Sequence, residues 1–411
     1  MLRKAGGSLC LLMAGSVASA QPAADSLASS WSVTYNQEVR YSFWTGDRGS
    51  PVSSAGASGS GAQLYSPFGV SVSGKLHEDF KLQLGVYGGS VWSRQSTAGY
   101  TGTVATVTDT TMSSTLTYGG FDGWQPYVSL SVNLPTGRSV LKGSAANARM
   151  DSDLVDVGSF GGGLTIGPTI GVNVSLTDEL MLSFGAGHTV PYKFDVEGSI
   201  DPDTLQQGTT EVAPGRNTSF NASLGYQAGA IYLQILGSYS TSSDSYTNNT
   251  LSYRAGDQWS VSANGSYNWT PETVTAVSGS WSHGQKNKVY DSNLAMLVYD
   301  EDNSNNSYYR ARIEHSMTHE LWTIGPYASW LRRTVNSYNP TTYQFVQAKT
   351  RWGLGAAVKY SVNSRIQLNA SIERIWVFED ENPEKPFYGI DAIPALRFDA
   401  VAIVIGGTVQ F

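Results

Sequence analysis

Apolar and polar residues alternate one by one along most of the chain, and residues 258–269 show this pattern most clearly. One face carries Trp259, Val261, Ala263, Gly265, Tyr267 and Trp269, and the other carries Gln258, Ser260, Ser262, Asn264, Ser266 and Asn268. A period of two predicts β-strands, because successive side chains of a strand point to opposite faces. The polar face is mainly Ser, Thr, Asn, Gln and Gly. That composition favours a barrel interior over the charged outer face of a soluble sandwich.

Short and long connections also alternate along the chain. Short turns are predicted at residues 76–79, 119–123, 177–179, 228–230, 270–272, 318–320 and 362–364. Longer segments rich in Gly, Ser, Asn and Asp include 45–62, 135–156, 191–216 and 285–305. Short turns on the periplasmic side and long loops outside are the arrangement of an outer-membrane barrel.

The turns and loops divide the chain into about 16 strands, an even number as in other single-chain bacterial barrels. The predicted spans are 31–44, 63–75, 80–92, 109–119, 124–134, 157–176, 180–190, 217–228, 230–240, 257–269, 273–284, 306–317, 321–333, 348–361, 365–377 and 397–411. Residues 101–117 could hold a longer strand, so about 14 or 18 strands stay open. The predicted fold is all-β: a transmembrane, antiparallel, up-and-down β-barrel.

The N-terminus predicts export. Residues 1–20 combine a basic start, a short apolar run and the small-residue site Ala18-Ser19-Ala20, which together predict a cleaved signal peptide. Residues 21–30 would be a short periplasmic segment and residues 31–411 the barrel, which leaves no room for an N-terminal plug domain. A loop such as 191–216 could still fold inward.

The composition sets further limits on function. After the predicted signal peptide the chain has no apolar run of about 18 residues, so no transmembrane helix is expected. It then has no cysteine, because the one cysteine is Cys10, and this excludes disulfides and thiolate metal sites. Removing Arg3 and Lys4 changes the net charge from −7 to −9, which speaks against nucleic acid as a partner.

The last strand is the second strong signal of a barrel. Val401, Ile403, Ile405, Gly407, Val409 and Phe411 alternate on one face up to the end of the chain. This ending resembles the C-terminal signature of outer-membrane barrels, and the resemblance implies that Ile403, Ile405, Val409 and Phe411 are read by the barrel-assembly machinery. Aromatic residues near the predicted strand ends favour girdles in contact with outer-membrane lipids. They are Tyr41, Phe43, Trp92, Trp124, Tyr192, Tyr239, Tyr267, Trp269, Trp322 and Trp376.

Charged residues predicted to face the lumen are unevenly distributed. The basic ones are Arg40, Lys81, Arg310, Arg312, Arg333, Lys349, Arg351, Lys359 and Arg365, and the acidic ones are Glu38, Glu314 and Glu373. Most lie between residues 306 and 377, on consecutive strands, and would form a basic patch on one wall. Such a patch favours anions. The alternative is that the carboxylates pair with the arginines and fill the wall.

Catalytic and metal sites are not expected. The sequence contains no Gly-x-Ser-x-Gly nucleophile elbow, and the one Ser/His candidate is His283 with Ser280 or Ser282. His315 and His319 have the spacing of helical metal ligands but lie at a strand-to-turn junction. The chain is therefore expected to be no enzyme and to need no cofactor.

Residues 126–137, Pro-Tyr-Val-Ser-Leu-Ser-Val-Asn-Leu-Pro-Thr-Gly, resemble the outer-membrane barrels associated with phenol meta-pathway degradation. The resemblance implies passage of hydrophobic or aromatic compounds. Three functions stay open: a porin-like channel for small polar solutes with a weak anion preference, a specific transporter of hydrophobic or aromatic compounds, and a structural or surface-interaction barrel with a filled lumen. The solute is not identified, and a homo-oligomer is an open alternative.

Overall fold

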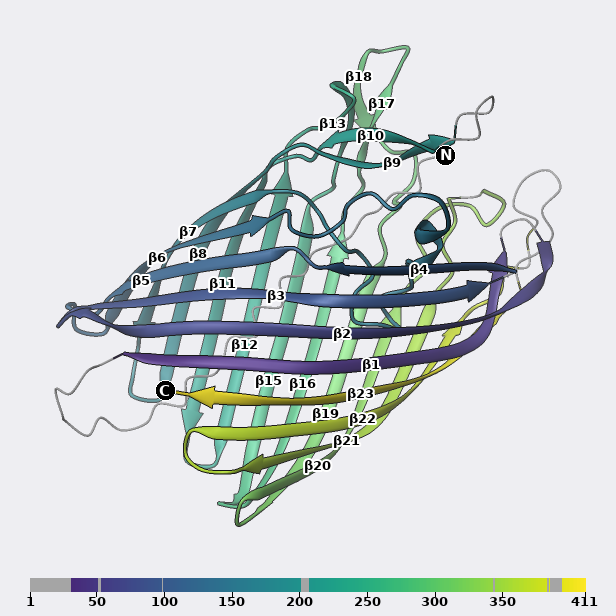
Figure 1. Cartoon of the computed structure of the whole chain (residues 1–411). Coiled ribbons are helices and arrows are strands. Elements are labelled where there is room, and N and C mark those ends of the chain that lie inside the picture. The colour runs from purple at the N-terminus through teal and green to yellow at the C-terminus, as the bar shows by residue number, and fades with distance from the viewer. Residues whose placement is uncertain are drawn as a thin grey trace.

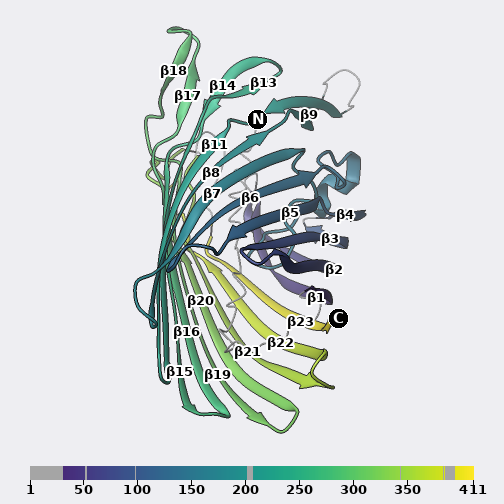
Figure 2. The same cartoon turned by 90° about the vertical axis from the view of Figure 1, so that its left-hand side faces the viewer.

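The chain folds into a closed antiparallel β-barrel with 16 strand positions around its circumference (Figures 1 and 2). The computed structural model describes residues 31–50, 53–97, 99–200, 207–342, 344–382, 384 and 394–411. The predicted signal peptide and periplasmic segment lie outside these residues. The first strand closes the barrel by pairing with the last, from Thr34 opposite Gln410 to Gly46 opposite Phe398.

The barrel is an up-and-down meander of consecutive antiparallel neighbours. Its first half consists of β1 (Ser32–Ser50), β2 (Ser53–His77), β3 (Phe80–Thr97), β4 (Tyr100–Val107), β5 (Thr110–Tyr118), β6 (Trp124–Leu134), β7 (Thr165–Ser175), β8 (Leu180–Pro191) and β11 (Asn217–Ala228). Its second half consists of β12 (Ile231–Ser242), β15 (Gln258–Thr270), β16 (Thr273–Gly284), β19 (Ser307–His319), β20 (Trp322–Arg333), β21 (Lys349–Ser361), β22 (Ile366–Glu379) and β23 (Leu396–Gln410). β4 and β5 share one position, because both pair with β3.

The predicted strand number of 16 is confirmed, and several predicted strand boundaries need correction. The predicted loop 45–62 is mostly strand, because β1 and β2 continue as a long hairpin with Trp44 opposite Gly61. The predicted strand 157–176 begins only at Thr165. Residues 101–117 belong to β4 and β5, which pair with successive parts of β3 and therefore add no strand position to the barrel.

Three loops at the end of the barrel opposite the short turns join into a second, six-stranded sheet (Figure 1). Its order is β18 (Met296–Tyr299), β17 (Lys288–Asp291), β14 (Thr250–Arg254), β13 (Ser245–Thr247), β10 (Gln207–Ala213) and β9 (Phe194–Ile200). The loop at 191–216, which could have folded inward, instead forms the β9–β10 hairpin of this sheet.

The outer face of the barrel is apolar and exposed, as a lipid-facing surface must be. Val261, Ile313 and Ile405 each keep about half or more of their surface exposed, while their neighbours in sequence point inward. Because the closed sheet pairs its backbone groups between strands, it can cross a bilayer. These features place the chain in the outer membrane as a multi-strand barrel. Among the described residues, no helix has the length and apolar character needed to cross a bilayer.

Charge is confined to half of the barrel wall. The eight consecutive strands β5, β6, β7, β8, β11, β12, β15 and β16 contain no Asp, Glu, Lys or Arg. All the charged side chains of the barrel strands lie on β19–β23 and β1–β3. The two halves therefore present different chemistry to the lumen.

Candidate pore constriction

The loop between β6 and β7, residues 135–164, folds into the barrel and contacts β1–β4 and β21–β23 of its wall. Its one regular element is a short 3₁₀ helix, η1 (Gly143–Ala148). Inward-facing side chains from several strands contact its backbone and side chains. Trp44 Nε1 donates to Met150 Sδ at 3.1 Å, Gln63 Nε2 to the Val157 carbonyl at 2.8 Å, and Ser93 Oγ to the Ala148 carbonyl at 3.1 Å. The loop is therefore docked on β1, β2 and β3.

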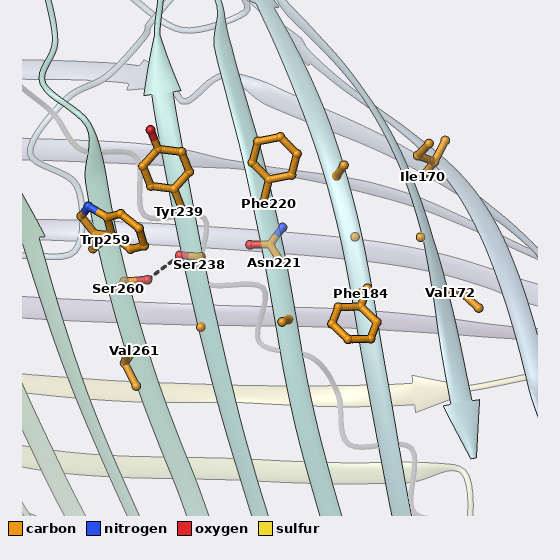
Figure 3. A pocket seen from close by; sticks show the side chains of 15 residues that line it. Ile170, Val172, Phe184, Phe220, Asn221, Ser238, Tyr239, Trp259, Ser260 and Val261 are labelled. Carbon is orange, nitrogen blue, oxygen red and sulfur yellow. Dashed lines mark hydrogen bonds between the residues drawn. The ribbon is translucent and has the colours of Figure 1, made fainter. Parts of the chain in front are cut away.

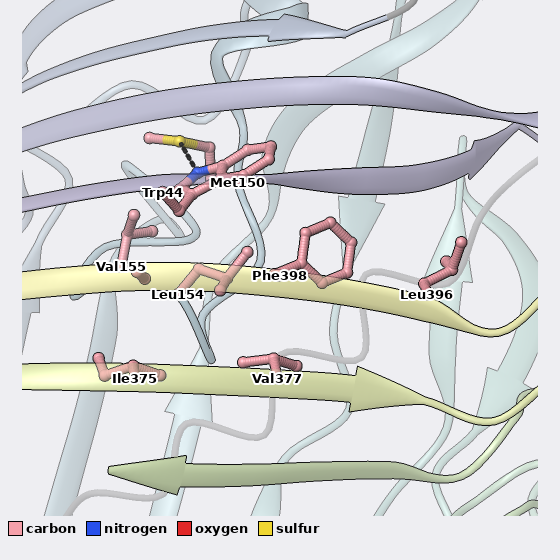
Figure 4. Close-up of a cluster of buried hydrophobic side chains, with 9 residues drawn as sticks. Trp44, Met150, Leu154, Val155, Ile375, Val377, Leu396 and Phe398 are labelled. Carbon is pink, nitrogen blue, oxygen red and sulfur yellow. Dashed lines mark hydrogen bonds between the residues drawn. The ribbon is translucent and has the colours of Figure 1, made fainter. Parts of the chain in front are cut away.

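Apolar packing holds one side of the loop against the seam of the barrel (Figure 4). Met150, Leu154 and Val155 of the loop pack on a buried cluster that the wall supplies. The wall residues of this cluster are Trp44, Ile375, Val377, Leu396, Phe398 and Ala400. Burying each of the three loop side chains contributes about 1.5–3 kcal/mol. The inner wall is apolar here because the loop, and not water, covers it.

A second apolar cluster holds the other side of the loop. Leu141, Ala148 and Phe160 of the loop pack against Val91 of β3 and Val104 of β4. The close approach requires Gly102, since a Cβ on this residue would overlap the backbone of Ala148 and Asn147. The two clusters clamp the loop from both sides.

Lys349, at the start of β21, is the electrostatic anchor of the loop. Its side chain is only 2% exposed and its ammonium contacts three carboxylates. It forms a short ion pair with Asp151, a second with Asp153 at 3.0 Å and a third with Glu379 at 3.3 Å. Burial works to raise the pKa of Asp151, but the charge and hydrogen bond of Lys349 outweigh it, so this pKa lies below its usual value.

Asp109, between β4 and β5, fastens the two ends of the loop to each other. Its Oδ1 accepts a hydrogen bond from the Gly137 N–H at 2.9 Å, and its Oδ2 accepts one from the Gly162 N–H at 2.7 Å. Asn133 Nδ2 donates to the same Oδ2 at 2.9 Å and to the Gly163 carbonyl at 2.9 Å. The Asp109 carboxylate thus holds together the two ends of the loop, which lie far apart in sequence.

The loop is also tied to the second sheet. Arg149 forms an ion pair with Glu197 of β9 at 2.7 Å, and the Leu141 N–H donates to the same carboxylate at 2.6 Å. Burial works to raise the pKa of Glu197, but these two donors outweigh it and the net effect is a lowered pKa.

The predicted lumen charges on the strands are largely engaged with one another or with the loop. Arg40 pairs with Glu38 at 2.7 Å and with Asp156 of the loop at 3.2 Å. Arg312 pairs with Glu314, Arg333 with Glu379, and Arg351 with Glu373. Arg351 Nε also donates to the Asp153 carbonyl at 3.2 Å. Lys349 is buried beneath the loop. Its carboxylate partners Asp151, Asp153 and Glu379 were not among the residues predicted to face the lumen.

Four of the predicted basic residues form no ion pair with any described residue: Arg310, Lys359, Arg365 and Lys81. Lys75, missed by the sequence prediction, joins them at the short-turn end, where it lies directly opposite Lys81 in the β2–β3 register. Lys75 could have been predicted to face the lumen, because it lies on the same face of β2 as Gln63.

β11, β12, β15 and β16 lie on the far side of the barrel from β1–β3 (Figure 1). Figure 3 shows the polar side chains Asn221, Ser238 and Ser260 of these strands beside larger apolar ones. On β11, β12, β15 and β16 the outer faces carry residues such as Phe220, Tyr239 and Trp259, and the inner faces carry serines and amides. Asn221, Ser238, Ser260 and Ser282 lie in one register row, and Ser238 and Ser260 share a hydrogen bond of 2.6 Å. A solute between this wall and the loop would meet hydroxyl and amide groups.

His283 contacts a serine other than its two predicted partners. His283 Nδ1 bonds Ser307 Oγ at 2.9 Å, not Ser280 or Ser282, and no arrangement of three or more metal-ligating side chains occurs among the described residues. The alternate residues Ile403, Ile405, Val409 and Phe411 lie on the outer face of β23, with Phe411 at its end and 71% exposed. Their reading by the assembly machinery stays a prediction.

No protein-family model matches the sequence, and no curated protein matches it. Several solved structures share the barrel fold. OpdQ of Pseudomonas aeruginosa has 11% identity and a TM-score of 0.44, over 92% of this chain and 99% of that chain. The anion-selective porin from Comamonas acidovorans has 11% identity and a TM-score of 0.40, over 93% and 99%. The CymD monoaromatic hydrocarbon channel has 11% identity and a TM-score of 0.39, over 94% and 89%. At such identities the likeness concerns the fold alone.

Proposed function

We propose that this barrel is a channel for the passive passage of small polar solutes, which pass between the docked loop and the serine-rich wall. The observation that supports the proposal most is the placement of the loop. It lies on one side of the barrel, over β21–β23 and β1–β4, and its contacts with the described residues do not extend to the far wall. A barrel of this strand number encloses an aqueous channel unless other parts of the chain fill it.

We further propose a weak preference for anions. Five of the nine predicted basic residues are paired, so the wall is far less positive than its sequence suggests. Arg310, Lys359, Arg365 and Lys81 remain, together with Lys75. Unpaired cations along a pore favour anions, but five charges spread over several strands give only a modest effect.

The transport of hydrophobic or aromatic compounds is less well supported. The apolar inner-wall residues, such as Ile375 and Phe398, are buried beneath the loop and offer no continuous apolar path to a solute. A purely structural barrel would need a filled lumen, and one docked loop covers only part of the wall.

Planar-bilayer recording in a KCl gradient tests these proposals together. We expect step-like conductance and a reversal potential shifted toward the equilibrium potential of chloride. A closed barrel without conductance would refute the channel, and a clear cation preference would refute only the anion preference.

A further inference from the structure

We propose that Arg310, Ser280 and Ser262 form a binding site in the lumen for a small hydroxylated carboxylate of the sugar-acid type. The proposal rests on the proposed channel function, since the site is reached only from the lumen. The site adds a substrate class to that function, because Arg310 supplies a positive charge and the two serines supply hydroxyl groups.

Arg310 presents its guanidinium to the lumen. It lies on the inner face of β19, because Tyr309 and Ile313 on the alternate positions point outward. Its exposed guanidinium lies over the ring of Tyr308, at 5.5 Å from the centroid, and forms no ion pair with a described residue. The nearby Arg312 differs, because it pairs with Glu314 at 2.9 Å.

An exposed guanidinium without an ion pair is suited to binding a carboxylate. Its planar fork can donate two parallel hydrogen bonds to one carboxylate, which a lysine ammonium cannot do. Stacking on Tyr308 restricts the side chain, so less conformational freedom is lost when the anion binds. Arg310 is therefore better prepared for an anion than Lys359 or Lys81.

The register of the neighbouring strands places two serines in line with Arg310. Ser280 of β16 lies directly opposite Arg310, and Ser262 of β15 lies directly opposite Ser280. With neighbouring strands about 4.8 Å apart, the row extends roughly 10 Å from Arg310. Outward-facing Val261 and Val277 show that the intervening serines face the lumen.

The next row has the same character. Asn264 lies opposite Ser278, and Ser278 lies opposite Arg312. A ligand whose carboxylate binds Arg310 therefore extends over serine hydroxyls with an amide beside them. These groups both donate and accept hydrogen bonds, as the hydroxyls of a sugar require. β15 and β16 carry no Asp or Glu that would repel the anion.

The guanidinium and the serine hydroxyls together select the ligand class. A neutral sugar would use the serines but not Arg310, and a simple carboxylate would use Arg310 but not the serines. A sugar acid uses both, so it should bind more tightly than either of its halves.

The test is concentration-dependent block of the single-channel KCl current by glucuronate, glucose and propionate. Glucuronate is expected to block at a lower concentration than the other two solutes. Arg310→Gln should weaken glucuronate block by about 10- to 100-fold, as expected for hydrogen bonds to a charged group. The double variant S262A/S280A should weaken block by glucuronate but leave block by propionate unchanged.

Lys359→Gln is the matched control, because it removes one unpaired positive charge from the inner wall far from the serine rows. It should change glucuronate block by less than about twofold, since only diffuse charge is lost. Equal effects of R310Q and K359Q would overturn the site, as would equal block by glucuronate and propionate. In both cases a conducting channel would leave the proposed function intact, whereas absent conductance would remove that function first.

Discussion

Replacing Lys349 by methionine should release the inward loop from the wall. The substitution keeps much of the side-chain volume and removes the cation that Asp151 and Asp153 share. Removing one partner of a buried ion pair costs about 3–5 kcal/mol. Asp151 keeps 37% of its side chain exposed and can regain water, so the lower limit of about 3 kcal/mol applies. Each 1.4 kcal/mol is a factor of ten, so loop opening should become roughly 150-fold more frequent.

Thiol labelling measures this opening directly. Val155 is 5% exposed in the docked loop, and cysteine fills a similar space there. In a V155C background, K349M should raise the labelling rate about a hundredfold, in line with the estimated loss. Lys359→Met is the control, because Lys359 lies on the same face of β21, exposed and without an acidic partner among the described residues. An unchanged rate in K349M would refute the view that Lys349 anchors the loop.

Two further predictions follow from the contacts of the loop. The lowered pKa of Asp151 means that its ion pair stabilises docking above its usual value of 3.8 and is lost as the pH falls through the lowered pKa. Single-channel recordings should therefore show a rise in conductance only in strong acid, and Asp151→Asn should abolish that pH-dependent step. Gly102→Ala should destabilise docking by about 1–3 kcal/mol, because the new Cβ meets the Ala148 backbone. Gly237→Ala, which adds a Cβ where no atom lies within 4 Å, should have little effect; equal thiol labelling of both variants in the V155C background would contradict the packing argument.

The barrel itself could be predicted because its signal is local. Alternation along β15 or β23 is visible in a dozen residues, and a strand shows its two faces without reference to its neighbours. The predicted boundaries failed where local composition misleads. Residues 45–62 are rich in Gly and Ser and suggest a loop, yet β1 and β2 continue through them as a paired hairpin.

The docking of the inward loop could not be predicted, because it depends on residues far apart in the chain. Lys349 and Asp151 are 198 positions apart, and no pattern within either segment connects them. A partial signal did exist. Leu141 and Met150 are large apolar residues in a segment expected to be a polar loop, and Val377 and Phe398 are apolar at inward positions. Apolar residues in the loop and at inward strand positions together indicate that the loop packs on the inner wall of the barrel.

The apolar cluster beneath the loop has a consequence for biogenesis. The strands that close the barrel carry Ile375, Val377 and Phe398 on the inner face, while Ile372 and Ile405 lie on the outer face. Before the loop covers them, these strand segments are apolar on both faces and prone to misassociate. The loop between β6 and β7 belongs to the same chain, so it is available to cover these strand segments as the seam forms. We therefore expect closure of the seam and docking of the loop to be coupled, so that loop variants reduce the yield of inserted barrels.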